Sequence, residues 1–397
     1  MSEKQKKLAQ TWPKVALLIE PNRGYERALI RGIARYCGVH RPWQFVRPAP
    51  FWERDRRFDI VRFLRENQPD GIIMRETKNM KAILSLRLPV VASNYLCQSV
   101  PGAINIVTDH QAIGIMAADH LLACGFTNFA YCGYDEMFWS KQRQEGFCRR
   151  IKKAGFSVTC FDSLRYHGRR DDEPLLDWIK KLPRPTGLMA CIDERGQQLM
   201  ELCSRSDLRV PDDIGIIGVD NDEMICELSF RPMSSVAITA EQGGFDSAER
   251  LDQLMRGRKN TSALQPVVIH PVHVVTRQST DIIHCPDSSV AQALRFIRDN
   301  SKDPLSVNDV VKHVPLSRRV LEKRFRRFLG CSILKEIKRC RIDYISRLLL
   351  QTHSLISEIA LASGFSDEAH IARYFRSQTG MTPRAFRARR GILKTPI

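Results

Sequence analysis

Short apolar runs alternate with amphipathic stretches over the first two thirds of the chain. The apolar runs have the length of buried strands, and the stretches between them repeat apolar residues every three or four positions, as helices do. The predicted strands are 15–19, 71–74, 89–92, 129–133, 187–190 and 214–219, and the predicted helices are 25–36, 113–124, 142–153 and 196–203. This alternation is typical of parallel sheets with helices on both faces.

This α/β region spans 14–280, which is too long for a single sheet of five or six strands. We therefore expect two α/β lobes. A break around Pro286 follows, and beyond it only helical periodicity remains. The expected organisation is an N-terminal tail (1–13), a two-lobed domain (14–280), a linker (281–289), an all-α domain (290–390) and a C-terminal tail (391–397).

The helical region contains one pattern twice, about fifty residues apart. Each copy has a short apolar helix, a break at Pro or Gly, a serine expected at the N-cap, and a second helix rich in cations. The matching residues are Val310, Pro315, Ser317, Leu321, Phe325 and Gly330, then Ile359, Gly364, Ser366, Ile371, Phe375 and Gly380. The second copy carries one inserted residue after the serine. A cation-rich second helix suits a DNA major groove, so two helix-turn-helix units are predicted.

Charge is concentrated in the same region. The formal net charge is +18, and residues 286–397 hold 22 Lys and Arg against 10 Asp and Glu. A basic terminal domain beside a nearly balanced one indicates a polyanionic partner, here double-stranded DNA. A merely solvated basic surface is the alternative.

Other classes of protein find little support in the sequence. The twelve cysteines form no Cys-x-x-Cys motif, and no apolar run approaches membrane-spanning length. Nucleotide-binding glycine loops and the Gly-x-Ser-x-Gly motif of hydrolases are absent. The first residues do not resemble a secretory signal. We expect a cytoplasmic protein that is not an enzyme, with reduced cysteines in its cores, no cofactor, no bound metal and no membrane partner.

Residues 208–221 resemble the effector-binding core of LacI-type repressors and periplasmic sugar-binding proteins. Gly133, Arg143, Asp193 and the closing segment 277–280 extend this resemblance over most of 14–280. It implies two lobes joined by three crossovers, with a small effector, a monosaccharide, in the cleft between them. Such clefts form at the carboxyl ends of strands.

The predicted effector-binding residues stand mostly at strand ends and suit a polyol. A carboxylate such as Asp220 can accept protons from adjacent sugar hydroxyls, and by resemblance Arg143 presents its guanidinium to the same ligand. The predicted set is Asp220, Arg143, Asp193, Trp139, Glu20 and Tyr25, with Arg23 and Glu26 as further candidates. Two alternatives stay open: Arg143 and Asp220 form an ion pair within one lobe, and Trp139 is a core aromatic. Asp109 is expected to cap the helix that follows it.

Residues 290–390 resemble the DNA-binding domain of AraC/XylS regulators. The resemblance rests on Phe365, Ile371, Phe375, Gly380, Pro383 and Phe386. Pro315 and Ile371 depart from the family pattern, which often has Gly and Phe there. Leu321, Phe325 and Phe328 are expected to face inward, and a helix over 340–350 should link the two units. The predicted DNA contacts are Arg318, Arg319, Glu322 and Lys323, then Glu368, Ala369, Arg373 and Arg376, of which Arg376, like Arg324, suits a phosphate contact or plain surface.

A sensor placed ahead of an AraC-type reader is an uncommon order of parts. The layout, including 23–27 and 32–36, is similar to that of pentose-responsive regulators. This resemblance implies a pentose effector, D-xylose first, activation through RNA polymerase, and a homodimer. A repressor that responds to another monosaccharide and a sugar-acting enzyme are the alternatives.

Overall fold

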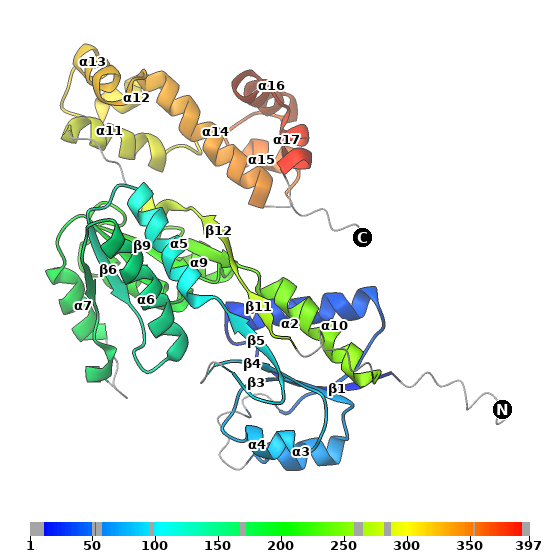
Figure 1. Ribbon diagram of the computed structural model, residues 1–397. Coiled ribbons are helices and arrows are strands. Elements are labelled where there is room, and N and C mark those ends of the chain that lie inside the picture. Colours follow the sequence, from blue (N-terminus) through cyan, green and yellow to red (C-terminus); the bar gives the residue numbers. More distant parts are fainter. Residues whose placement is uncertain are drawn as a thin grey trace. The chain divides into compact units, whose positions relative to one another are not determined.

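The computed structural model describes residues 12–49, 52, 58–95, 99–166, 172–257, 265–281, 287–351 and 354–390. The chain divides into two compact units, Met1–Ile282 and Ile283–Ile397 (Figure 1). Residues 1–11 of the predicted N-terminal tail, 282–286 of the predicted linker and the whole predicted C-terminal tail lie outside the described residues. No helix in the described ranges has the length and hydropathy needed to cross a membrane.

The first unit contains two six-stranded sheets. The first sheet has the order β11-β5-β4-β3-β1-β2 and comprises β1 (Lys14–Leu18), β2 (Gln44–Val46), β3 (Gly71–Arg75), β4 (Val90–Ser93), β5 (Ile104–Thr108) and β11 (Val267–Ile269). The second has the order β12-β10-β9-β8-β6-β7 and comprises β6 (Asn128–Cys132), β7 (Val158–Cys160), β8 (Thr186–Ala190), β9 (Ile214–Val219), β10 (Ser234–Ile238) and β12 (Pro271–Val275). The prediction of two α/β lobes is confirmed. The expectation of purely parallel sheets is wrong for β12, which runs antiparallel to β10.

Within the described residues, the chain passes between the two sheets three times: after β5, after β10 and after β11. The crossing segments lie side by side, because the backbone N–H of Asp109 donates to the carbonyl of Ile269 and that of Thr239 donates to the carbonyl of His270, each at 2.9 Å. A few adjacent crossing residues are the usual hinge of a two-lobed protein.

Helices cover both faces of each sheet. The first lobe has α2 (Gly24–Val39), α3 (Ile60–Asn67), α4 (Met80–Leu84) and α10 (Ala240–Met255), and the second has α5 (His110–Ala123), α6 (Phe138–Lys153), α7 (Asp172–Lys181), α8 (Asp193–Ser204) and α9 (Glu223–Leu228). The packing of strand β1 explains its apolar run from Val15 to Leu18. Val15 and Leu17 pack under α2 and α10, whereas Ala16 and Leu18 pack against α3 and α4. A strand buried on both faces needs such a continuous apolar run.

Glycines set the distance between the paired helices. A Cβ at Gly32 of α2 would overlap the backbone oxygen of Glu241 in α10, and a Cβ at Gly244 of α10 would overlap a backbone oxygen of α2. Gly114 and Gly146 allow the same backbone contact between α5 and α6. In each lobe, therefore, one pair of helices crosses so closely that only glycine fits at the contact.

The second unit is all helical, as expected. Its elements are α11 (Ser288–Asp299), α12 (Val307–Lys312), α13 (Arg318–Leu329), α14 (Ile333–Gln351), α15 (Ile356–Ala362), α16 (Glu368–Thr379) and α17 (Pro383–Arg390). Two separate cores form, one around Phe325 and one around Phe375. Helix α14 contributes Ile337 to the first core and Leu349 to the second, so it joins the two helix-turn-helix units. It is the predicted linking helix, but it begins earlier than residue 340.

Helices α13 and α16 bury the same positions. Leu321 and Phe325 in α13, like Ile371 and Phe375 in α16, are fully buried. The expectation that Phe328 faces inward is wrong, because its side chain is 37% exposed. Phe328 lies in the last turn of α13 but outside the core, whereas the next residue, Leu329, packs against the core, and Gln378 is the counterpart of Phe328 in α16.

The helix crossing gives a stability prediction with a control on the same helix. We expect Gly32→Ala to destabilise the protein by about 1–3 kcal/mol, because the new methyl group overlaps α10. At Gly38 in α2, no atom lies within 4 Å of the place that a methyl group would take, so Gly38→Ala should stabilise the helix by about 0.5–1 kcal/mol. Urea unfolding of the two variants measures both effects. Equal changes would contradict the close crossing.

Candidate functional site

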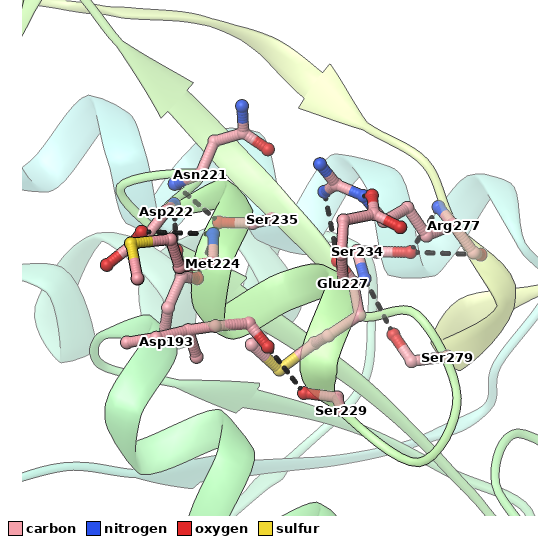
Figure 2. Close-up of polar contacts among 12 residues, drawn as sticks. Asp193, Asn221, Asp222, Met224, Glu227, Ser229, Ser234, Ser235, Arg277 and Ser279 are labelled. Atoms are coloured by element: carbon pink, nitrogen blue, oxygen red, sulfur yellow. Dashed lines mark hydrogen bonds and ion pairs between the residues drawn. The ribbon is translucent and has the colours of Figure 1, made fainter. Parts of the chain in front are cut away.

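The turn after β9 has an unusual backbone. Asp220 has φ 101° and Asn221 has φ 50°, a region that residues other than glycine adopt infrequently. Two hydrogen bonds hold the turn: the N–H of Asn221 donates to Ser235 Oγ at 2.9 Å, and the N–H of Asp222 donates to Asp193 Oδ2 at 2.7 Å (Figure 2). Strain of this kind is retained where the surroundings fix it, often at functional sites.

Asp193 lies beneath this turn. Its side chain is fully buried, and its Oδ1 accepts a second hydrogen bond, from Ser235 Oγ at 2.6 Å. Burial, followed by the nearby Asp220, raises the pKa of the Asp193 carboxyl well above its usual range. A Cβ at Gly218 would collide with this carboxylate, which explains the glycine in β9. Asp193, predicted as an effector contact, has both oxygens engaged inside the protein, a geometry suited to positioning the turn.

Asp220 and Arg143 face each other in the second lobe. Arg143 Nη2 lies 3.6 Å from Asp220 Oδ1, and their side chains are 4% and 6% exposed. Burial raises the pKa of Asp220, while Arg143 and then Arg23 counteract the rise. Arg143 also donates through Nη1 to the carbonyl of Cys191. The ion pair anticipated as an alternative exists, but its length exceeds that of a hydrogen bond and leaves both groups capacity for another partner.

Several buried polar atoms around this pair have no hydrogen-bond partner in the described part of the chain. They are Asp220 Oδ1, Asn221 Oδ1, Arg143 Nε, Trp139 Nε1, His110 Nδ1 and Glu26 Oε2. They are neighbours: the Arg143 guanidinium lies 5.2 Å from the Trp139 ring centroid, and burial followed by Arg143 lowers the pKa of His110. Because buried polar groups are nearly always hydrogen-bonded, such a cluster is typical of a site for a polar ligand.

The N-terminus of α2 brings the first lobe to this cluster. The Tyr25 hydroxyl lies 3.3 Å from Thr108 Oγ1, and burial raises its pKa, with a contribution from Asp220. Burial also raises the pKa of Glu26, to which Asp220 again contributes. Arg27 forms an ion pair with Asp222 and so connects the two lobes directly. The site therefore lies between the lobes, at the carboxyl ends of their strands.

Two predicted residues also have contacts outside the cluster. Glu20 accepts a hydrogen bond from Asn22 at 2.7 Å and lines a groove with Arg47 and Trp52, and its Oε1 atom is buried without a hydrogen-bond partner in the described residues. Trp139 is buried in the core of the second lobe, as the alternative anticipated, and the Arg143 guanidinium lies over its ring.

Sequence reasoning missed His110, Asn221 and Asp222. His110 directly follows Asp109, which caps α5 as expected by accepting from the N–H of Ala112 at 3.0 Å. Its position just after β5 was an available signal. Asn221 and Asp222 follow Asp220 directly, but only the folded turn shows that they share its site.

Polar contacts continue from the turn to the end of the first unit. Asp222 caps α9 through the N–H of Met224 at 3.3 Å, and Glu227 of the same helix accepts from Arg277 Nε at 2.7 Å (Figure 2). Arg277 precedes Ser279, whose N–H and hydroxyl bonds fix the last turn of the unit. Helix α9 thus contacts both the cleft and the segment that leaves the sensor.

In the second unit, the predicted DNA contacts form an exposed surface on each helix-turn-helix. Seven of them are exposed and Glu322 is half-buried; the exposed ones are Arg318, Arg319, Lys323, Glu368, Ala369, Arg373 and Arg376. Arg324 is different, because it forms an ion pair with Asp287 at 2.7 Å. That pair links α13 to the start of α11, so the surface interpretation is the better one for Arg324.

The cap of α16 corrects one expectation. Asp367, not Ser366, is the N-cap: its Oδ1 accepts from the N–H of His370 at 2.7 Å, and this bond lowers the pKa of its carboxyl. Ser366 instead donates to Asp367 Oδ2 at 2.9 Å. At the equivalent position of α13, Ser317 is the N-cap residue but makes no side-chain cap bond. The residue inserted in the second copy therefore supplies a stronger helix start.

This difference between the caps predicts a local effect. Asp367→Ala should speed hydrogen exchange over the first turn of α16, because the N–H of His370 loses its acceptor. Ser317→Ala is the control and should change exchange in α13 much less. Hydrogen-exchange mass spectrometry measures both variants. Equal changes would contradict a stronger cap at Asp367 than at Ser317.

Comparison with known proteins covers both units. A family of periplasmic binding protein-like domains matches residues 118–280, and a family of helix-turn-helix domains matches residues 310–389. The chain is 28% identical to the xylose operon regulatory protein of Haemophilus influenzae over 393 residues, covering 96% of this chain and 99% of that protein. The protein of the same name from Escherichia coli (strain K12) is 28% identical over 386 residues, covering 94% and 96%.

Solved structures give the same picture. That of a xylose-binding transcription activator has a TM-score of 0.74 and 26% sequence identity, and covers 96% of this chain and 98% of that chain. A periplasmic binding protein/LacI-type regulator from Alkaliphilus metalliredigens, complexed with D-xylulofuranose, has a TM-score of 0.55 and 16% identity and covers 67% of this chain and 98% of that chain. The second likeness concerns the fold alone.

Proposed function

We propose that this chain, a transcription regulator that joins a periplasmic binding protein-like sensor to a helix-turn-helix domain of AraC type, binds a pentose in its cleft and activates genes for its breakdown. D-xylose is the favoured effector. RNA polymerase and a second copy of the chain are the further partners that we propose.

The observation that carries this proposal is the cluster of buried polar atoms beside Asp220. The cluster offers acceptors on Asp220 and Asn221 and donors on Arg143 and Trp139, and these atoms lack partners in the described residues. Neighbouring hydroxyls of a monosaccharide both donate and accept, so one small sugar can satisfy such a mixed set. The names of the full-length relatives favour D-xylose among the pentoses.

The exposed residues of α13 and α16 suggest which bases the helix-turn-helix domain recognises. By the offset of fifty residues, Lys323 in α13 corresponds to Arg373 in α16, and Arg319 corresponds to Ala369. Arginine pairs best with guanine, and alanine contacts the methyl group of thymine. The two helix-turn-helix units therefore contact different base sequences, and a single chain recognises an asymmetric site.

The contact between Arg27 and Asp222 suggests how sugar binding changes the sensor. A sugar held by Asp220 from one lobe and Tyr25 from the other adds to this contact and favours the closed cleft. Shifting a two-state protein from 1:99 to 99:1 takes about 5.5 kcal/mol of differential binding. Charge-assisted hydrogen bonds contribute roughly 1.5–3 kcal/mol each, so a few suffice. Closure then alters how the sensor domains of two chains pack and how far apart their helix-turn-helix domains lie.

A repressor that responds to another monosaccharide is the alternative, because the cleft chemistry suits any small polyol. Transcription from a reporter under the chain's own target promoter, with and without D-xylose, separates the two proposals. Activation requires more transcript when both sugar and regulator are present than when the regulator gene is deleted.

Asp220→Asn tests the effector site. Asparagine keeps the shape and tolerates positive φ, but it removes the charge from bonds worth roughly 1.5–3 kcal/mol, so D-xylose affinity should fall about 10–100-fold. Calorimetry on the full chain measures the affinity. Glu66→Gln is the matched control, since Glu66 is exposed on α3, where it pairs with Arg62, and it should leave the affinity unchanged. A normal affinity in Asp220→Asn, or a loss in Glu66→Gln, would contradict the assignment of the site.

Arg373→Ala tests base reading. We expect a cost of about 1–3 kcal/mol on a selected duplex and a relaxed preference at one base position. Arg324→Ala removes an arginine that pairs with Asp287, and it should leave the base preference intact. Anisotropy titrations against single-base variants of the duplex measure both. Equal losses by Arg373→Ala on selected and random duplexes would identify a phosphate contact.

A further inference from the structure

Two cysteines of the second lobe lie in direct contact. The Sγ atoms of Cys148 in α6 and Cys160 at the end of β7 are 3.9 Å apart. Neither is fully buried, in contrast to Cys191, Cys203 and Cys226. Cys160 packs against the core of the second lobe, as expected of the cysteines, but both members of the pair stay partly exposed.

The position of the pair makes it accessible from solvent. Strand β7 is the edge strand of the second sheet, and Cys160 is its last residue, opposite Tyr131 of β6. Cys148 and Cys160 are both partly exposed. A small solute can therefore reach this edge of the lobe.

The contact also favours the reactive form of one thiol. The hydrogen bond from Cys148 lowers the pKa of Cys160 to about 7, because the Cys148 proton stabilises the Cys160 thiolate. The same bond raises the pKa of Cys148, which stays protonated. Burial raises the pKa of another half-buried cysteine, Cys124, to about 11. Since the thiolate is the nucleophile, Cys160 should react with oxidants before Cys124 does.

We propose that Cys148 and Cys160 are an oxidant-responsive dithiol, a modification site that closes to an intramolecular disulfide when the chain meets a hydroperoxide. The placement of one sulfur against the other, at a partly exposed sheet edge, carries this proposal. It is independent of the sugar that the cleft binds.

The chemistry balances in two steps. The Cys160 thiolate attacks the outer oxygen of the hydroperoxide, the O–O bond breaks, and a sulfenic acid forms with release of an alcohol, or of water from hydrogen peroxide. The Cys148 sulfur then attacks the sulfenic sulfur, its proton leaves with the hydroxyl as water, and the S–S bond forms. Two thiols lose two electrons and two protons in total, and the hydroperoxide is reduced. A small thiol reverses the reaction by exchange.

The disulfide would connect elements that matter for the cleft. A disulfide bond is about 2.05 Å long, so the two sulfur atoms must approach each other by roughly 2 Å from their contact distance. Helix α6 also carries Arg143, five residues before Cys148. The bond would therefore tie the helix that lines the cleft to the outer edge of the sheet.

Peptide mapping of the oxidised full chain tests the proposal. The reduced protein is treated with hydrogen peroxide, its remaining thiols are alkylated, and the digest is analysed by mass spectrometry. We expect a disulfide-linked pair of peptides that contain Cys148 and Cys160. Its mass should be lower by two hydrogen atoms than the sum of the two free peptides, and dithiothreitol should release both peptides. In Cys148→Ser, Cys160 should stop at a sulfenic acid that dimedone traps.

The double variant Cys124→Ser/Cys331→Ser is the matched control, because it removes two other half-buried cysteines and should keep the full response. The wild-type map alone can overturn the proposal. It does so if Cys148 and Cys160 remain fully alkylated at peroxide doses that oxidise other cysteines. It also does so if the recovered disulfide joins other cysteines or two chains.

Discussion

The buried carboxyl group of Asp193 holds the turn that carries Asp220. It accepts hydrogen bonds from the N–H of Asp222 and the hydroxyl of Ser235, and it occupies space that a side chain at position 218 would fill. These bonds keep Asp220 at positive φ, so that its own carboxylate points at Arg143. A buried acid raises the cost of folding unless its bonds are complete. Here the bonds of Asp193 are complete, whereas Asp220 Oδ1 is buried without a hydrogen-bond partner in the described residues.

The same turn places one residue, Asp222, in contact with three parts of the sensor. Its N–H bonds to Asp193, its carboxylate caps α9, and it pairs with Arg27 across the cleft. Helix α9 then contacts Arg277 near the end of the first unit. A two-state element that both sites bias is the physical requirement for coupling. The turn and α9 connect Asp222 to Arg277 by hydrogen bonds, and the structure shows one state of this connection.

Sequence patterns predicted the architecture because apolar periodicity and the doubled helix pair are local signals. They predicted Asp220 and Arg143 through resemblance, and both lie in the cluster. The supporting role of Asp193 was not predictable, since its partner Ser235 lies 42 residues away. The capping role of Asp367 was missed because a serine in the repeated pattern was the simpler choice. Phe328 fits the apolar period, but so does Leu329, and the period alone does not tell which of the two packs on the core.

Sugar and DNA are expected to act on one equilibrium of the same chain. Thermodynamic linkage requires that each ligand change the other's affinity by the same factor. The direct measurement is calorimetry of D-xylose binding to the full chain, alone and saturated with a duplex selected from random sequences. We expect sugar affinity to change about fivefold or more, with the same change in DNA affinity when sugar is present. A sugar affinity that is identical with and without DNA would contradict it.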